Sequence, residues 1–228
     1  MNIEKPKIIV AIPCYNEEKF IGDLVKRAFL HADMVLVVDD GSTDNTAAVA
    51  QAAGAVIKKH GRQKGAGAAT KSSFQAAIEY DCDILVTMDG DAQHNPDEIP
   101  LVIEPILLGK ASLVIGSRFL QQAEIRKSRK FGIQVITWLY NFGHSGKITD
   151  SQCCFRAHSR NLVENIKITD SGFGYSIEVL VQARKRGFDI TEVPVSCIYH
   201  SEGSTMNPIP HGFGVAFSVI KHRIKELN

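Results

Sequence analysis

The first 118 residues alternate short apolar runs with segments of helical periodicity, and this alternation constrains the fold more than any other feature. The apolar runs are rich in β-branched residues and lack polar alternation, which is typical of buried strands in a parallel sheet. They lie at residues 7–12, 34–38, 55–57, 84–88 and 113–115. The segments between them are predicted to be helices; residues 17–30, for example, repeat apolar side chains at i, i+4 and i+8. We expect an α/β fold with a mostly parallel central sheet covered by helices on both faces.

The character of the sequence changes near Phe119, after which helical and partly irregular segments dominate the C-terminal third. Residues 189–199 add one more strand-like piece. Internal repeats, low-complexity tracts and Gly/Ser linkers are absent from the sequence. A single domain over residues 1–228, with halves at 1–118 and 119–228, therefore fits better than two domains.

Charge and cysteine content exclude several classes of protein. Lys+Arg 26 against Asp+Glu 25 leaves a net charge of +1, which does not favour a nucleic-acid partner. Five cysteines and no signal-peptide pattern argue against a disulfide scaffold and favour a cytoplasmic location. The longest uncharged stretch, residues 131–146, is shorter than the ~20 apolar residues of a membrane-spanning helix.

Acidic residues follow three of the predicted strands. Because the carboxyl ends of parallel strands meet at one edge of a sheet, these side chains are expected to converge there. That much unpaired negative charge calls for a cation or a cationic ligand. The residues concerned are Glu17 after the first strand, Asp39 and Asp40 after the second, and Asp89 and Asp91 after the fourth.

The sharpest of these features is the pair Asp89 and Asp91, separated by Gly90. Two carboxylates at i and i+2 suit one hard divalent ion, and Mg²⁺ and Mn²⁺ prefer such oxygen ligands. An EF-hand loop does not fit, since His94 and Pro100 stand where Gly and Glu are required. The structural alternative is a solvated turn or a helix cap.

Three motifs in order resemble the family 2 glycosyltransferases, which have the nucleotide-sugar-binding GT-A fold. Residues 12–18 (IPCYNEE) are similar to the opening nucleotide loop of that family. Residues 38–44 (VDDGSTD) resemble its base- and ribose-contacting turn, and Asp89-Gly90-Asp91 resembles its metal-binding DxD motif. The resemblance covers nearly the whole chain.

Within that family the second half looks most like the polyprenyl-phosphate sugar transferases of the dolichol-phosphate mannosyltransferase type. The similar segments are residues 89–96 (DGDAQHNP), 115–118 (IGSR), 149–156 (TDSQCCFR) and 174–178 (GYSIE). Two departures stand out. Cys154 replaces a glycine that is usual before Phe-Arg, while His200 and Thr205-Met206 replace an arginine and Ser-Lys.

The resemblance implies a metal-dependent, inverting transfer of a hexose, of mannose or glucose type, from a GDP- or UDP-linked sugar to a dolichyl or undecaprenyl phosphate. Residues 1–118 would bind the nucleotide sugar and residues 119–228 the acceptor. The implied donor contacts are Pro13, Tyr15, Glu17, Asp39, Asp40, Lys64, Asp89 and Gly90, with Asp89, Asp91 and Gln93 holding Mg²⁺ or Mn²⁺. The implied acceptor-phosphate contacts are Arg118, Arg126, Arg129 and His200, and the implied catalytic residues are Asp91, Arg118, Asp150 and Arg156.

Several of these residues have structural alternatives. Asp39 is also suited to capping the next helix, and Glu17 to the first turn of one. Lys64 and the run Arg126–Lys130 are equally typical of solvated basic surface.

The acceptor decides whether a base is needed. A phosphate monoester, with a second pKa of about 6, is already largely ionised at neutral pH, whereas a sugar hydroxyl requires a general base. Asp150 would be that base for a saccharide acceptor in glycan synthesis; for a lipid phosphate it would orient Arg156 or a neighbouring group. A non-catalytic nucleotide-sugar-binding module is a third hypothesis, motivated by Cys154 and His200.

Two amphipathic segments are relevant to how a lipid acceptor would be bound. Residues 125–142 combine basic side chains with Phe131, Val135, Trp138, Leu139 and Phe142 at helical spacing. Residues 213–227 carry a second apolar stripe flanked by basic residues. Such helices are suited to a membrane interface, on the cytoplasmic face in this case, and equally to packing on the sheet or forming a dimer contact.

Overall fold

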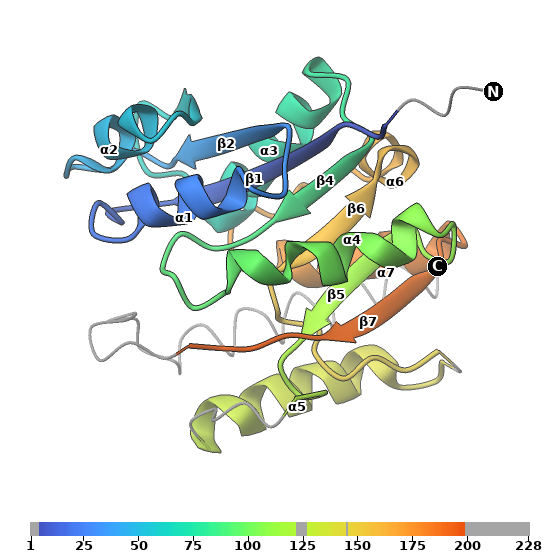
Figure 1. Ribbon diagram of the computed structural model, residues 1–228. Helices are drawn as coiled ribbons and strands as arrows, with labels where there is room; N and C mark the ends of the chain where they lie inside the picture. Colours follow the sequence, from blue (N-terminus) through green and yellow to red (C-terminus); the bar gives the residue numbers. More distant parts are fainter. Residues whose placement is uncertain (1–4, 122–126, 145, 199–228) are drawn as a thin grey trace.

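The computed structural model describes residues 5–121, 127–144 and 146–198, with the side chains of residues 127–129 also outside the description (Figure 1). The described residues form a seven-stranded sheet in the order β3-β2-β1-β4-β6-β5-β7. The strands are β1 (Ile8–Cys14), β2 (Met34–Asp39), β3 (Val56–Lys59), β4 (Ile84–Thr87), β5 (Leu113–Ser117), β6 (Arg156–Ser159) and β7 (Ile190–Pro194).

The sheet is mostly parallel, as the apolar runs predict. β1 pairs with β2 and β4 in parallel, β2 with β3, and β5 with β7. The exception is β6, which pairs antiparallel with both β4 and β5. The sequence analysis missed β6, because Arg156-Ala-His-Ser159 has neither an apolar run nor strict alternation.

Helices cover both faces of the sheet, as expected. Figure 1 shows α1 and α4 in front of the sheet and α3 and α7 behind it. The helices are α1 (Ile21–Ala28), α2 (Thr46–Ala52), α3 (Ala66–Glu79), α4 (Ile99–Leu107), α5 (Lys127–Asn141), α6 (Arg160–Asn165) and α7 (Tyr175–Lys185), and a 3₁₀ turn, η1 (Pro96–Glu98), precedes α4. These elements confirm the helices predicted in the first half.

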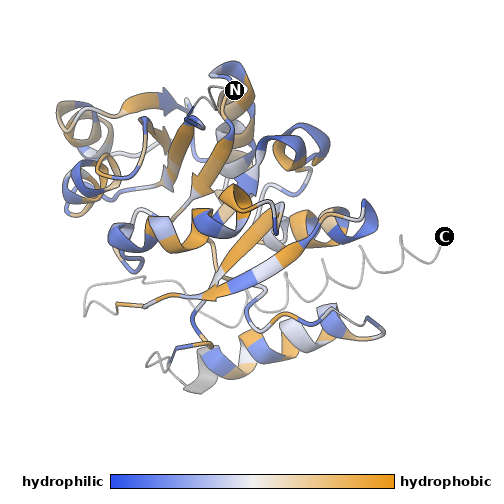
Figure 2. Cartoon of the chain, turned by 45° about the vertical axis from the view of Figure 1, so that its right-hand side comes forward, coloured by the Kyte–Doolittle hydropathy of each residue, from blue (hydrophilic) through white to orange (hydrophobic). Residues whose placement is uncertain are grey.

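The hydrophobic core follows the strands. Every residue of β4 and β5 is buried, and β1 and β2 are buried except for one half-buried residue each. Several strands are accordingly orange over most of their length in Figure 2, while the helices alternate apolar and polar bands. Burial on both faces explains why these strands read as continuous apolar runs.

The turn before α4 begins with a side-chain cap. Asn95 caps it by accepting a hydrogen bond from the Asp97 amide at 3.2 Å, and Pro96 occupies the first position. The Glu98 carboxylate instead accepts from the Ser196 amide at 3.0 Å, just beyond β7. Glu98 therefore ties the segment that follows the last strand to the start of α4.

Helix α5 lies along the β5–β7 side of the molecule, at the bottom of Figure 1. Its residues Ile136 and Tyr140 join the hydrophobic core. The second predicted amphipathic segment, residues 213–227, lies outside the described residues. Among the helices that are described, none combines the length and apolar character needed to cross a membrane.

Candidate active site at the carboxyl edge of the sheet

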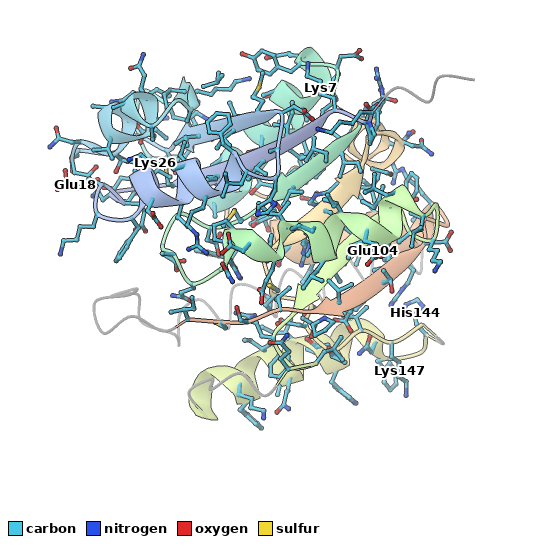
Figure 3. The ribbon with its side chains drawn as sticks, viewed as in Figure 1. Lys7, Glu18, Lys26, Glu104, His144 and Lys147 are labelled. Atoms are coloured by element: carbon cyan, nitrogen blue, oxygen red, sulfur yellow. The ribbon has the colours of Figure 1, made fainter. Side chains whose placement is uncertain are left out.

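Hydrogen bonds join the loop after β1 to the loop after β2. Asn16 accepts a hydrogen bond from the Thr43 amide at 2.9 Å, and the Glu17 amide donates to Thr46 Oγ1 at 2.7 Å. Glu18, labelled in Figure 3 in the loop between β1 and α1, accepts from the Asn45 amide at 2.9 Å. The two motifs singled out at these strand ends are therefore held together, as the parallel sheet predicts.

The Asp89-Gly90-Asp91 turn packs directly against the loop after β1. A Cβ added to Gly90 would lie 2.8 Å from Cys14 Cβ and 3.4 Å from Glu17 Cγ, so a larger residue does not fit without displacement. Glycine at this position lets the two aspartates approach Glu17. This close approach explains why the residue between the two aspartates is a glycine.

The pKa of Glu17 is affected by burial and by the negative charge at this edge. Burial first, and then the charges of Asp91, Asp89 and Asp44, raise the pKa of Glu17 from 4.5 to about 7. Carboxylates from the loops after β1, β2 and β4 thus act on one another across the edge. This is the convergence that the sequence predicts.

The aspartate pair is ordered locally by its own turn. Asp91 Oδ1 accepts a hydrogen bond from the Gln93 amide at 3.0 Å, and Ala92 between them has a left-handed φ of 58°. Asp89 remains 44% exposed at its side chain, and its Oδ2 lies 3.8 Å from His94 Nε2. Both carboxylates therefore belong to a surface turn rather than to the core.

The donor set suits a divalent ion bound with a ligand. Among the residues that the structure describes, no group of three His, Cys, Asp or Glu side chains is arranged to hold a metal alone. Mg²⁺ commonly uses one or two carboxylates, with waters and substrate phosphates completing its shell. Asp89 and Asp91 fit that mode. Gln93, the third predicted ligand, is buried, and its backbone carbonyl accepts a hydrogen bond from the Ile198 amide at 2.9 Å.

The two aspartates after β2 differ in what surrounds them. Asp39 is fully buried, accepts from the Ser42 amide at 2.8 Å and lies 3.5 Å from Lys59 Nζ. Asp40 is buried and accepts from the amides of Lys64 and Gly65, at 3.0 and 2.7 Å. Asp40 therefore holds the loop that leads into α3.

His60, which the sequence analysis did not single out, completes this arrangement. Its Nδ1 lies 2.6 Å from Asp40 Oδ1, and its Nε2 lies 2.9 Å from Ser72 Oγ on α3. A chain of hydrogen bonds thus joins the turn after β2 to helix α3. No local sequence signal marks His60, because its partners are contributed by the fold.

The predicted donor residues Pro13, Tyr15 and Lys64 lie at the same edge. Pro13 is half-buried within β1, and the side chains of Tyr15 and Lys64 are exposed beyond the strand ends. The structure thus brings together the predicted donor residues of the loops after β1, β2 and β4.

The second half is dominated by a buried ion pair. Arg118 Nε and Nη2 donate to Asp150 Oδ2 and Oδ1 at 2.7 and 2.9 Å. Burial acts to raise the pKa of Asp150, but the charge and hydrogen bonds of Arg118 outweigh it and lower that pKa. Asp150 also accepts from the Gln152 amide at 3.3 Å. Asp150 therefore orients Arg118 rather than Arg156.

Arg156 is also buried, and it organises the chain around it. Its Nε donates to the carbonyl of Cys153 at 2.8 Å, and its two terminal nitrogens donate to the carbonyls of Ser176 and Ser151 at 2.9 and 2.8 Å. This guanidinium therefore joins three segments of backbone.

The unusual Cys154 lies between the two regions. Its carbonyl accepts from Thr87 Oγ1 at 3.0 Å, and its thiol accepts from the Tyr175 hydroxyl at 3.4 Å. Burial first, and then the charge of Asp89, raise the pKa of the Cys154 thiol to about 12. The side chain that replaces glycine is thus a neutral thiol near the aspartate turn.

Three of the residues predicted to contact the acceptor phosphate fall wholly or partly outside the description. Arg126 and His200 lie outside the described residues, and so does the side chain of Arg129.

The chain is similar to known glycosyltransferases. The model of the family "Glycosyl transferase family 2" matches residues 9–167. The chain is 33% identical to a UDP-N-acetylglucosamine–dolichyl-phosphate N-acetylglucosaminyltransferase of Methanococcus voltae, over 84% of this chain and 86% of that protein. It is 29% identical to a polyprenol monophosphomannose synthase of Mycolicibacterium smegmatis, over 83% and 77% of the two chains.

A solved structure shows the same fold. The glucosyl-3-phosphoglycerate synthase of Mycobacterium tuberculosis, crystallised with Mn²⁺, UDP-glucose and phosphoglyceric acid, superposes with a TM-score of 0.79. The similarity covers 95% of this chain and 79% of that one at 21% identity. Since the family model spans well over half of the sequence, the protein belongs to glycosyl transferase family 2, as a glycosyltransferase with the GT-A fold.

Proposed function

We propose that this glycosyltransferase moves a hexose, of the mannose or glucose type, from a GDP- or UDP-linked sugar to a polyprenyl phosphate, with inversion at the anomeric carbon. Two of its relatives are named for transfer to dolichyl phosphate and for synthesis of polyprenol monophosphomannose. Those names and the family favour catalysis over a non-catalytic binding module.

Donor binding is assigned to residues 1–118, at the edge where the loops after β1, β2 and β4 meet. Asp89 and Asp91 would hold Mg²⁺ or Mn²⁺ against the diphosphate, with Gln93 as a further candidate ligand. When bound, the ion would stabilise the negative charge that develops on the leaving nucleotide diphosphate. Burial, and then the charges of Asp91, Asp89 and Asp44, raise the pKa of Glu17 to about 7, so the carboxylates lie close enough together for a cation at this edge to be favourable.

The observation that carries the choice of acceptor is the state of Asp150. A hydroxyl acceptor needs a general base, but both Asp150 oxygens accept hydrogen bonds from Arg118, whose charge lowers the Asp150 pKa. A carboxylate engaged in this way is poorly suited to take up a proton. A phosphate acceptor, which is already ionised, needs no such base. The arrangement therefore supports a lipid phosphate over a saccharide hydroxyl.

The acceptor phosphate is assigned to residues 119–228 together with Arg118. A guanidinium grips phosphate oxygens in pairs, and a buried partner such as Asp150 pre-orients it. Arg126, Arg129 and His200 remain candidates for the same phosphate. We place the protein at the cytoplasmic face of the membrane, where the lipid acceptor and the nucleotide sugar are both accessible.

The test compares two acceptors that differ only in the reacting group. Radiolabelled GDP-mannose, UDP-glucose and UDP-N-acetylglucosamine are supplied in turn, with Mn²⁺ or Mg²⁺, to a polyprenyl phosphate and to the matching polyprenol. We expect a lipid-linked product from one donor, with the phosphate alone and in the presence of the metal. Transfer to polyprenol or to a saccharide, with none to the phosphate, would contradict the proposal.

A further inference from the structure

The order of the strands places the start of β6 between the donor edge and the second half of the site. β6 lies between β4, which leads into the aspartate turn, and β5, which is followed by Arg118 (Figure 1). Because β6 runs antiparallel to β4, Arg156 at its start pairs with Thr87 at the carboxyl end of β4. A sugar transferred from the donor edge to a phosphate in the second half must therefore cross the residues just before β6.

The residues just before β6 are held against the aspartate turn at two points. Thr87 Oγ1, in the strand that leads to Asp89, donates to the Cys154 carbonyl at 3.0 Å. The rings of Phe155 and His94 lie 5.4 Å apart, at the other end of the turn. Cys154 and Phe155 therefore lie alongside the turn that carries the two aspartates.

Cys154 is the partly exposed residue of this segment. Cys153 and Phe155 on either side of it are fully buried, whereas Cys154 is half-buried. The Tyr175 hydroxyl donates to the Cys154 thiol at 3.4 Å. Burial contributes most to the raised pKa values of Cys154 and Tyr175, and the charge of Asp89 also contributes to both. The Cys154 thiol therefore lies at the donor edge, on the side of Asp89 that faces β6.

The backbone at Cys154 leaves the size of its side chain free to vary. Among the described residues other than glycine, a left-handed φ occurs at Asn16, Asp81 and Ala92, and Cys154 is not one of them. A side chain is thus tolerated at the position where the similar transferases usually carry a glycine. The Cβ and Sγ atoms of Cys154 take up space beside Asp89 that a glycine would leave open.

The covalent structure of a nucleotide sugar indicates which part of the sugar lies at this position. In the proposed function the metal at Asp89 and Asp91 binds the diphosphate, to which the anomeric carbon of the sugar is bonded. The substituent at C2, on the neighbouring carbon, is therefore among the parts of the sugar nearest to the metal. It is a hydroxyl in glucose and mannose and a larger acetamido group in N-acetylglucosamine. A side chain beside Asp89 is suited to distinguish these groups by size.

We propose that the Cys154 side chain limits the C2 substituent of the donor to the size of a hydroxyl, and so selects hexoses over 2-acetamido sugars. The inference rests on the proposed function, because it takes the diphosphate to be bound at the aspartate turn. Overlap with a packed side chain is unfavourable, since its neighbours can move only a little. Cys154 is thus a specificity-determining residue of the donor site.

The test compares two donors that carry the same nucleotide and differ only at C2. The pairs are UDP-glucose with UDP-N-acetylglucosamine and GDP-mannose with GDP-N-acetylmannosamine, and the pair used is the one whose nucleotide binds the wild type. Calorimetry with Mn²⁺ measures the affinity of both donors and of the nucleoside diphosphate alone. The proteins are the wild type, Cys154→Gly, Cys154→Val and the control Cys82→Ala. Cys82 precedes β4 and lies at the opposite edge of the sheet.

We expect the wild type to bind the hexose donor roughly tenfold or more tightly than the 2-acetamido donor, as a size limit in a binding site produces. Cys154→Gly should reduce this preference to about threefold or less, because it opens the space beside Asp89. Cys154→Val should weaken binding of the hexose donor roughly tenfold, since its side chain is larger. Affinity for the nucleoside diphosphate should be equal in all four proteins, and Cys82→Ala should keep the wild-type preference.

Two results would overturn the proposal. One is a wild type that binds both donors equally or prefers the 2-acetamido donor. The other is an unchanged preference in Cys154→Gly, measured in a variant that still binds the nucleoside diphosphate. Thermal unfolding verifies that each variant folds. If Cys154→Gly does not fold, unchanged binding of the hexose donor by Cys154→Val overturns the proposal by itself.

Failure of this inference is separable from failure of the proposed function. Equal transfer to polyprenyl phosphate from both donors would support the proposed function and contradict the role of Cys154. Selective binding of the hexose donor, lost in Cys154→Gly and accompanied by no transfer to polyprenyl phosphate, would contradict the proposed acceptor and support the role of Cys154.

Discussion

The two halves of the site use charge in opposite ways. At the donor edge, Asp89 and Glu17 are partly exposed, and burial together with the charges of Asp91, Asp89 and Asp44 raises the pKa of Glu17 to about 7. In the second half, Arg118 is paired with Asp150 and Arg156 donates to three carbonyls, all within the core. The donor edge thus gathers several carboxylates that act on one another, while the buried arginines of the second half bind groups of the protein itself.

This difference separates partly exposed side chains at the donor edge from buried side chains that also hold the site together. A cluster of neighbouring carboxylates is suited to bind a positively charged ligand. A buried ion pair or a guanidinium bonded to carbonyls fixes backbone geometry and is costly to break. Substitutions at the donor edge should therefore reduce activity with little loss of stability, whereas substitutions at the buried Arg118–Asp150 pair should reduce stability as well as transfer to the acceptor.

The largest effect is expected from Asp91→Asn. Removing one metal-binding carboxylate should lower the transfer rate roughly a thousandfold, because metal stabilisation of the leaving group is worth several kcal/mol. The free energy of unfolding should change little, since the side chain lies in a surface turn. Asp23→Asn, at an exposed position on α1, is the control and should keep wild-type activity. Parallel losses of activity and stability in Asp91→Asn would break the distinction between the halves.

The next largest effect is expected from Arg118→Met. The substitution leaves Asp150 charged and buried, which should cost about 3–5 kcal/mol of unfolding free energy in urea. Arg160→Met is the matched control; its partners Asp81 and Glu164 are at the surface, so about 1 kcal/mol or less is expected. Adding Asp150→Leu to Arg118→Met should recover part of the loss. Equal stability of the two single variants would show that the pair is not structurally important.

A pH effect should arise from His158 in the second half. Burial, and then the charge of Arg156, lower the pKa of His158 to about 3, while its Nδ1 donates to the Leu85 carbonyl at 3.2 Å. The folded protein keeps this side chain neutral, whereas the unfolded chain takes up a proton below pH about 6.5. The contribution of His158 to the free energy of unfolding is therefore complete above that pH. It is lost as the pH falls, by about 3 kcal/mol at pH 4.

Urea unfolding at pH 7 and pH 4 measures this effect as the difference between wild type and His158→Gln. Taking the difference between the two proteins cancels the contribution of Asp150. Its lowered pKa also makes the folded protein more stable at neutral than at acidic pH. An identical pH dependence in the two proteins would mean that His158 is protonated in the folded state.

The smallest effect is expected from His60→Ala, which lies behind the donor edge. Loss of the bonds to Asp40 and Ser72 should cost about 1–2 kcal/mol of unfolding free energy. Because Asp40 also holds the loop at Lys64 and Gly65, donor affinity should fall a few-fold. Calorimetric donor titration checks this, with Ser72→Ala as the control that keeps the Asp40 contact. Unchanged affinity in His60→Ala would limit the residue to a structural role.

Much of the donor edge could be predicted from sequence, because the relevant signals are local. Continuous apolar runs fix the parallel strands, and acidic residues at their carboxyl ends must share an edge. Asp89, Gly90, Asp91 and Glu17 were identified in this way. His60 was missed, since its role depends on Asp40 and Ser72, which the fold brings to it from other segments.

The second half could not be predicted to the same depth. β6 has a polar sequence and is a strand because β4 and β5 flank it. Arg118 and Arg156 look alike in sequence, yet one pairs with a carboxylate and the other with carbonyls. A charged residue does not reveal whether its partner is a ligand or its own backbone, so that choice depends on tertiary structure.

The most direct test of the account is metal-dependent binding of a nucleoside diphosphate, measured by calorimetry. GDP and UDP are titrated into the wild type and into Asp89→Asn/Asp91→Asn, with Mn²⁺ and then with a chelator. The account predicts that one nucleotide binds the wild type in the presence of Mn²⁺, and that binding is lost in the variant or with the chelator. Equal nucleotide affinity with and without the metal, in both proteins, would contradict the assignment of the aspartate pair.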